Sequence, residues 1–178
     1  EIGEDEKAFG LPIGWVYCRL GDIGVIGSSS RVHKKDWTKT GVPFYRAREI
    51  VKLSKHGEVD DDLFISEELF EALSIRGLTP EANDIMITGV GTIGVPYVVK
   101  RKDRFYFKDA SVLIFKNASG DSAEFLEYLM RSPYWDVAVH SDSMGTTVHT
   151  LTISRASEVP VAIPPLAEQH RIVAKVDE

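Results

Sequence analysis

Cysteine is almost absent from the sequence, since Cys18 is the only one among 178 residues. A single thiol excludes an internal disulfide and a cysteine-rich zinc site, and it suits a reducing compartment, so we expect a cytoplasmic protein. The five histidines lack metal-ligand spacing on any one expected helix, so we expect no metal site. No apolar run has the length of a membrane span, and the acidic residues 1–6 do not follow the basic-then-apolar pattern of a secretory signal.

Motifs of catalysis are also lacking. No G-x-S-x-G nucleophile elbow occurs, and residues 163–166 (IPPL) lack the polar lead residue and the aromatic ring of an adenine-methylation loop. The acidic run Asp60, Asp61 and Asp62 cannot converge on a metal, because consecutive side chains of an extended chain point to alternate faces. We therefore expect a solvated acidic turn there, and a chain that is not an enzyme.

One motif resembles a nucleotide-binding turn. Residues 89–94 satisfy G-x-G-x-x-G with Gly89, Gly91 and Gly94, directly after an expected strand. A pyrophosphate site needs a helix to follow, whereas the next residues, 95–99 (VPYVV), favour extended chain through their β-branching and Pro96. We therefore expect a glycine-rich turn between two strands. A small nucleotide- or cofactor-binding enzyme that uses this turn is the alternative hypothesis.

The pattern of apolar residues and chain breakers predicts a strand-rich chain. The 178 residues fit one domain, and 43% hydrophobic with 27% charged residues is ordinary for a folded protein. Strands are expected at residues 16–20, 42–47, 84–88, 95–99, 104–107, 111–116 and 159–163. Helices are expected from a Ser66 cap to Gly77, from an Asp121 cap to Ser132–Pro133, and over residues 166–176 behind Pro165.

The net charge of −6 argues against a nucleic-acid partner only if the charges are evenly spread. Acidic residues gather in residues 1–6 and 58–71, whereas basic residues gather in 31–35, at Arg46 and Arg48, and in 100–108. This separation permits one basic face on an acidic protein. Charge alone leaves open the alternative that these are solvated loop side chains.

Motifs near both ends of the chain resemble those of a known family. Residues 11–15 (LPIGW) precede 20–23 (LGDI), and residues 163–169 (IPPLAEQ) precede 171–173 (RIV). In this order they resemble the borders of a target-recognition domain in the specificity subunit (HsdS) of type I restriction-modification systems. Between them, residues 43–50, 84–94, 145–151 and 159–163 resemble a strand, a glycine-rich hairpin, a late loop and the closing strand of that domain, so the resemblance spans about residues 11–176.

The resemblance implies a fold and a role. The fold would be mixed α/β (α+β) with strongly twisted, mainly antiparallel sheets and a few helices; residues 1–163 would be the recognition domain and 164–178 the start of a long helix. The domain would read one half of a bipartite DNA target without catalysis of its own. Its partners would be double-stranded DNA, methyltransferase subunits that methylate adenine and, through the complex, restriction subunits that cleave. S-adenosylmethionine, ATP and Mg would belong to those partners, with no cofactor in this chain.

A protein that reads DNA needs cations for phosphates and polar side chains for base edges. The expected phosphate anchors are Lys34, Lys35, Lys100, Arg101 and Lys102. The arginines expected to bind phosphate or guanine are Arg31, Arg46, Arg48 and Arg104. The smaller polar or imidazole side chains expected at the DNA are Ser28, Ser29, Ser30, His33, Thr92, Thr146, Thr147 and His149. On the C-terminal helix, Leu166, Val173 and Val176 form an apolar seam that we assign to a subunit interface.

Overall fold

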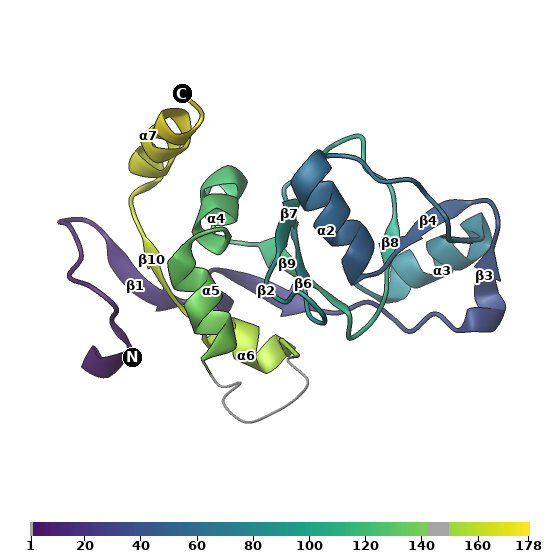
Figure 1. Ribbon diagram of the computed structural model, residues 1–178, viewed down its shortest axis with the longest axis horizontal. Coiled ribbons are helices and arrows are strands. Elements are labelled where there is room, and N and C mark those ends of the chain that lie inside the picture. The colour runs from purple at the N-terminus through teal and green to yellow at the C-terminus, as the bar shows by residue number, and fades with distance from the viewer. Residues whose placement is uncertain (1, 142–149) are drawn as a thin grey trace.

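A four-stranded antiparallel sheet occupies the centre of the structure, a computed structural model that describes residues 2–141 and 150–178 (Figure 1). Its strands, in spatial order, are β2 (Gly24–Gly27), β9 (Val112–Asn117), β6 (Ile85–Thr88) and β7 (Pro96–Val98). All of β6 and the first part of β9 are buried. Their unbroken apolar sequences are typical of strands that are covered on both faces.

Successive side chains of β6 and β9 enter two different cores, because a strand points alternate residues to opposite faces. The first core takes Ile85, Ile87, Leu113 and Phe115. The second core takes Met86, Val112 and Ile114. The central sheet therefore separates the two cores and forms one wall of each.

Helices cover the first core. They are α4 (Ala123–Met130), α5 (Pro133–His140) and α6 (Ile153–Glu158), grouped on one side of the central sheet in Figure 1. The expected cap at Asp121 is wrong by one residue, since Ser122 Oγ accepts from the Phe125 backbone N at 3.2 Å. Ser132 and Pro133, expected to end the helix, also begin α5, because serine caps a first turn and proline is tolerated at its first position. Helix α6 was not predicted from the sequence.

The two ends of the chain meet beside this helical group. Strand β1 (Val16–Arg19) pairs antiparallel with β10 (Pro160–Ile163), which confirms both expected border strands. A short 3-10 helix, η1 (Glu4–Glu6), precedes β1, and one helical turn, α1 (Leu20–Ile23), follows it. The expected C-terminal helix is α7 (Leu166–Val176). Its Gln169 is fully buried and accepts from the Ser122 backbone N at 2.8 Å, which ties α7 to the start of α4.

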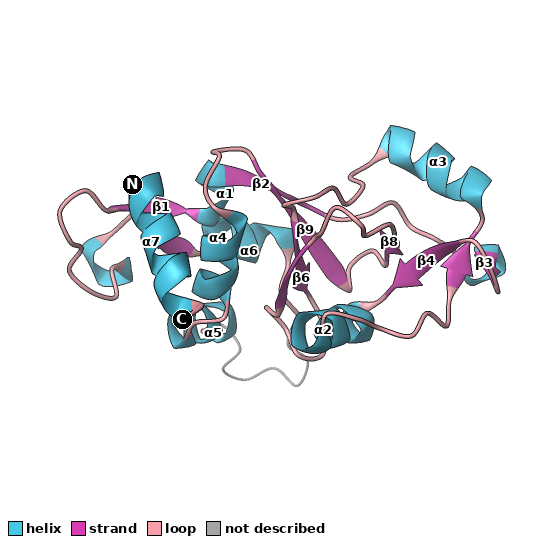
Figure 2. Ribbon diagram, turned by 90° about the horizontal axis from the view of Figure 1, so that it is seen from above, coloured by secondary structure: helices cyan, strands magenta, loops and turns pink. Residues whose placement is uncertain are grey.

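A second sheet forms the opposite end of the molecule (Figures 1 and 2). Its strands are β3 (Trp37–Thr38), β5 (Phe64–Ile65), β4 (Val42–Tyr45) and β8 (Tyr106–Phe107), antiparallel except for the parallel pair of β4 and β8. The 3-10 helix η2 (Lys34–Asp36) leads into β3, and α3 (Glu67–Arg76) follows β5. The expected Ser66 cap of α3 is confirmed by its acceptance from the Leu69 backbone N at 3.2 Å.

Helix α2 (Ala47–His56) was not predicted, and it corrects the strand expected over residues 42–47. Strand β4 ends at Tyr45, and the chain turns into α2 within two residues. Ile50 and Leu53 pack into the second core, so the helix covers the face of the central sheet opposite α4 to α6. Gly57 ends α2 with φ +73, a conformation that glycine adopts without strain.

Two glycines in the turn between β6 and β7 have positive φ but different surroundings. Gly94 has φ +78, and its carbonyl accepts from Trp135 Nε1 at 2.8 Å. A Cβ on Gly94 would lie 3.0 Å from both Trp135 Nε1 and Val139 Cγ2, two buried side chains. Gly91 has φ +70, and a Cβ there would meet nothing within 4 Å. Gly94 is therefore required by packing as well as by backbone conformation, whereas Gly91 is required by backbone conformation alone.

Gly94→Ala is expected to lower the free energy of unfolding by about 2–4 kcal/mol, since it adds overpacking to the cost of a positive φ. Gly91→Ala, the matched control, should lower it by about 1–2 kcal/mol through the backbone term alone. Urea unfolding of both variants and the parent measures the difference. Equal losses would contradict the packing contact between the hairpin and α5.

Candidate nucleic-acid interface

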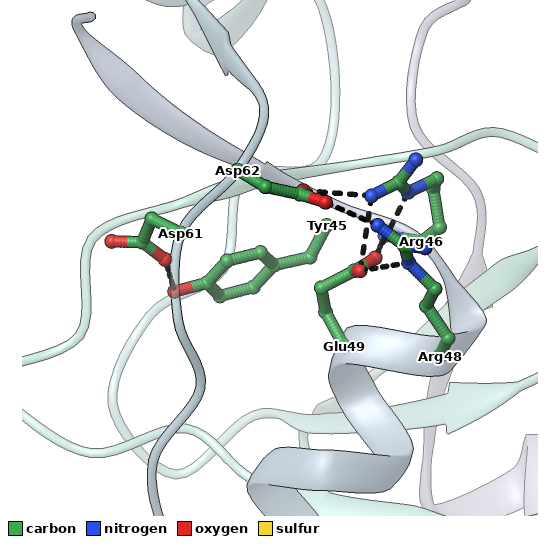
Figure 3. Close-up of polar contacts among 6 residues, drawn as sticks. All are labelled: Tyr45, Arg46, Arg48, Glu49, Asp61 and Asp62. Carbon is green, nitrogen blue, oxygen red and sulfur yellow. Dashed lines mark hydrogen bonds and ion pairs between the residues drawn. The ribbon is translucent and has the colours of Figure 1, made fainter.

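The first turn of α2 holds charged side chains around the carboxylate of Glu49, which is 3% exposed (Figure 3). Arg46 donates to this carboxylate from its backbone N at 2.8 Å, from Nε at 3.0 Å and from Nη2 at 3.0 Å. Arg48 donates to it from Nε. Asp62 lies on the other side of the two guanidinium groups, accepting from Arg46 Nη2 at 2.8 Å and from Arg48 Nη2. Both arginines are thus held between two carboxylates.

Local sequence explains the position of Glu49. It is the third residue of α2, where a carboxylate reaches back to the backbone N–H of Arg46 and interacts favourably with the helix dipole. Burial by itself raises the pKa of this carboxyl, but the hydrogen bonds from Arg46 and Arg48 outweigh burial and hold the pKa below its ordinary value. Glu49 is therefore ionised at neutral pH and fixes the direction of both arginines.

The acidic run of Asp60 to Asp62 is exposed as expected, but two of its carboxylates have partners. Asp62 binds the two arginines, and Asp61 accepts from the Tyr45 hydroxyl at 2.7 Å. Burial and this hydrogen bond raise the pKa of Tyr45. The expected separation of acidic from basic segments is therefore wrong at this point, because the loop after α2 returns the acidic run to the start of the helix (Figure 3).

The other selected arginines differ from this pair. Arg104 forms a two-pronged contact with Glu67, with Nη1 at 3.0 Å from Oε1, and its guanidinium lies 4.8 Å from the centre of the Phe70 ring. Both charged groups are about half exposed, so the pair contributes little free energy of its own. Arg31 is exposed in the loop before η2.

The selected lysine clusters lie at two places. Lys34 and Lys35 are in η2, beside β3 at one end of the molecule. Residues 100–102 form the turn after β7, where Lys100 Nζ lies 3.8 Å from a Cβ built on Gly57, at the end of α2. All are exposed, and no carboxylate among residues 2–141 and 150–178 lies within ion-pair distance of them. The structure thus leaves these cations unneutralised and brings the second cluster next to α2.

Three selected serines lie in a connection between the sheets. Ser29 Oγ donates to the Phe107 carbonyl at 2.6 Å, and the Ser30 backbone N donates to the Tyr106 hydroxyl at 2.9 Å. Ser28 Oγ accepts from the Ala110 backbone N at 3.2 Å. These contacts tie the loop after β2 to β8 and the turn that follows it.

The remaining small or imidazole side chains are placed as follows. Thr92 is exposed in the turn between β6 and β7, and its carbonyl accepts from the Thr88 hydroxyl. His33 is exposed at the start of η2, with its backbone N donating to Asp36 at 3.3 Å. Thr146, Thr147 and His149 lie outside the described residues.

The glycine motif of residues 89–94 lies in the hairpin between antiparallel β6 and β7, as expected. No helix follows it, so it offers no helix N-terminus to a pyrophosphate. A Cβ on Gly89 would lie 3.2–3.4 Å from the carbonyl oxygens of Leu151, Ala110 and Ser111. This glycine therefore allows three backbone segments to approach closely, and the nucleotide-binding alternative is not favoured.

The exposed face of α2 carries further basic residues beside those that the sequence predicts to contact DNA. Lys52, Lys55 and His56 are exposed on this helix, on the same face as Arg48. The sequence pattern does not predict these residues as DNA-binding, because residues 42–47 indicate a strand and mask the start of the helix. Residues 47–57 do contain features that are typical of a helix. They are Glu49 at the third position, apolar Ile50 and Leu53 on one side, a basic last turn, and then Gly57.

Neither a metal-binding cluster nor a reactive thiol is present among the described residues. Within residues 2–141 and 150–178, no three His, Cys, Asp or Glu side chains gather so that they could bind a metal. The Cys18 thiol is half-buried, and burial raises its pKa to about 11, so it is protonated and unreactive at neutral pH. Among the same residues, no helix has both the length and the apolar character of a membrane span.

The three residues of the apolar seam expected on α7 differ in exposure. Leu166 and Val176 are 46% and 55% exposed, whereas Val173 is half-buried and packs against the first core together with Ile172. One side of α7 therefore already has a partner in the domain, and the ends of the seam face outward.

Comparison with known proteins places the chain among restriction-system proteins. A family model described as a type I restriction modification DNA specificity domain matches residues 12–178. A putative type I restriction enzyme specificity subunit of Haemophilus influenzae is 31% identical over 160 residues, which are 89% of this chain and 38% of that protein. The EcoAI specificity subunit of Escherichia coli is 26% identical over 185 residues, 99% of this chain and 30% of that protein. The chain thus spans well under half the length of these relatives.

Solved structures share its fold. A chain from a structure concerned with complex assembly and conformational transition of the type I restriction-modification system superposes with a TM-score of 0.72 at 18% identity, covering 96% of this chain and 39% of that one. The HsdS subunit from Thermoanaerobacter tengcongensis superposes with a TM-score of 0.69 at 18% identity, covering 96% and 38%. The mixed α/β fold with mainly antiparallel sheets, expected from the sequence, is therefore confirmed.

Glu49→Gln is expected to lower the free energy of unfolding by about 1–3 kcal/mol at neutral pH, since two guanidinium groups lose their buried anionic acceptor. The folded-state pKa of Glu49 lies below its ordinary value of 4.5, so its stabilisation is complete above 4.5 and disappears as pH falls through the folded value. The gap between parent and variant should therefore close on acidification. Urea unfolding across a pH series measures it, with Glu58→Gln as the exposed control; a gap independent of pH would refute the ionised cluster.

Proposed function

Because this chain belongs to the family of type I restriction-modification DNA specificity domains, we propose that it is a target-recognition domain that reads one half of a bipartite DNA sequence. The proposal depends above all on the family match over residues 12–178, which includes the C-terminal border motif and all but Leu11 of the N-terminal one. The exposed cations beside α2 support it, since phosphate contacts supply most of the affinity of DNA-binding proteins.

The proposed role includes partners. Methyltransferase subunits would methylate adenine at the DNA sequence that this domain selects, and restriction subunits would join through the complex and cleave, in the cytoplasm. S-adenosylmethionine, ATP and Mg would be bound by those subunits. The exposed ends of the α7 seam, Leu166 and Val176, would contact a partner, and residues 164–178 would be the first turns of the helix that carries the interface.

Methylome sequencing of the source strain tests this function. Deletion of the gene should remove one bipartite adenine-methylation motif from the genome, and reintroduction of the full-length gene should restore it. Exchange of this domain for that of a relative should change one half of the motif and leave the other half intact. A deletion strain and a domain-exchange strain that both keep the parent's methylation motifs would contradict the proposal.

A thermal-shift measurement on this chain with NAD(P) and S-adenosylmethionine provides the independent control. A binding ligand raises the unfolding midpoint by mass action. We expect no shift with either compound, and a saturable rise would favour the nucleotide-binding enzyme instead.

A further inference from the structure

One face of α2 carries three cations and a histidine. Arg48, Lys52, Lys55 and His56 follow one another at intervals of four, three and one residues, so they lie on the same side of the helix. Each is exposed, whereas Glu49, Ile50 and Leu53 on the inner side are buried. Figures 1 and 2 show α2 beside the central sheet. Its apolar side packs into the second core, and its basic side chains are exposed.

The turn of residues 100–102 extends this face. Lys100 Nζ lies 3.8 Å from the Cβ position of Gly57. A cavity of about 320 Å³ is lined by the end of α2 (Leu53, Ser54) and the start of the turn (Lys100, Arg101), and Glu124 and Glu127 of α4 line its other side. The two segments are far apart in sequence but form one surface. We call it the α2 basic face, and it consists of Arg48, Lys52, Lys55, His56, Lys100, Arg101 and Lys102.

Arg48, Lys52 and Lys55 repel one another electrostatically in the free protein. Arg48 and Lys52, and Lys52 and Lys55, are neighbours on the helix surface, where like charges destabilise a helix by a few tenths of a kcal/mol per pair. Lys55 gains from the dipole at the C-terminal end, but Lys52 in the middle does not. No carboxylate among residues 2–141 and 150–178 lies within ion-pair distance of Lys52 or Lys55. An external anion would therefore be stabilised here.

The geometry fits a chain of phosphates. From Arg48 to Lys55 the helix rises about 10 Å, at roughly 1.5 Å per residue. Neighbouring phosphates of one strand of duplex DNA are farther apart than their axial rise of about 3.4 Å, because the strand winds around the axis, so the face spans about two of them. An acidic protein partner fits less well, because the face has no aromatic or apolar side chain of the kind that anchors protein interfaces.

Asp62 partly neutralises the N-terminal end of this face. Its ion pair with Arg48 is more than half exposed on both sides, and such pairs contribute at most about 1 kcal/mol. A phosphate can therefore replace Asp62, while the buried Glu49 keeps the arginines in position. In the absence of DNA, the Asp62 carboxylate thus occupies the position beside the two arginines that a phosphate would take.

We propose that the α2 basic face binds the phosphate backbone of duplex DNA, and that the DNA displaces Asp62 from the two arginines. The proposal rests on the proposed function, because it assigns one surface of the domain to the duplex. It goes beyond that function by naming α2 as the element that lies along the backbone. It also assigns roles to Lys52, Lys55 and Asp62, which were not selected from the sequence.

Fluorescence anisotropy with a labelled mixed-sequence duplex and this chain tests the lysines. The double variant K52Q/K55Q should reduce the slope of log affinity against log salt by about two, since each lost phosphate contact removes about 0.9. The matched control K39Q/R76Q removes two exposed cations outside the α2 basic face, one between β3 and β4 and one at the end of α3, and should keep the parent slope. Thermal unfolding should show that both double variants are folded. A parent slope in K52Q/K55Q, or an equal reduction in the control, would overturn the proposal.

The variant D62N tests the displacement of Asp62, because its duplex affinity should rise. It should bind the same duplex several-fold more tightly at low salt, because Arg46 and Arg48 lose their competing carboxylate. D60N removes an exposed charge two residues away that binds no arginine in the described structure, and it should have a smaller effect. Equal effects of D62N and D60N would overturn the displacement of Asp62. Duplex binding by the parent with unaltered slopes in K52Q/K55Q would refute only the α2 face, whereas no duplex binding by the parent would contradict the proposed function as well.

Discussion

The structure depends on two strands that bury both of their faces. Because alternate residues of β6 and β9 enter different cores, each side of the central sheet must be covered by another layer. Helices α4 to α6 provide one layer and α2 provides the other (Figure 1). The apolar side of α2 is thereby committed to the sheet, and its cationic side is left at the surface. The proposed DNA-binding face is a consequence of how the core is closed.

The buried carboxylate of Glu49 links this packing to recognition. It caps the first turn of α2, and the same oxygens hold the guanidinium groups of Arg46 and Arg48. A side chain that stabilises the helix therefore also positions the cations that it presents. The protein has a net charge of −6, yet α2 presents a basic surface. Glu49 and Asp62 pair with Arg46 and Arg48, whereas no carboxylate among the described residues lies within ion-pair distance of Lys52 or Lys55. Distribution of charge matters here more than its sum.

Much of the fold and part of the site could be predicted from the sequence. The glycine-rich hairpin, the border strands and the helices over residues 67–76 and 166–176 follow from strong local signals, namely caps, breakers and β-branched runs. Helix α2 was missed because it begins two residues after a short strand, so the two periodicities overlap in residues 42–50. The Glu49–Asp62 cluster could not be predicted, because it depends on a loop returning to the start of a helix.

The sequence by itself determined the family, through two border motifs that are local in the chain, and it determined where cations and acids occur. Only the tertiary structure decided which of those charges neutralise one another. The physical reason is that an ion pair depends on distances of a few ångströms across the fold, whereas sequence patterns report on neighbours within one turn or one strand. Asp62 lies close enough to Arg48 to pair with it, whereas no carboxylate of the described residues lies within ion-pair distance of Lys52.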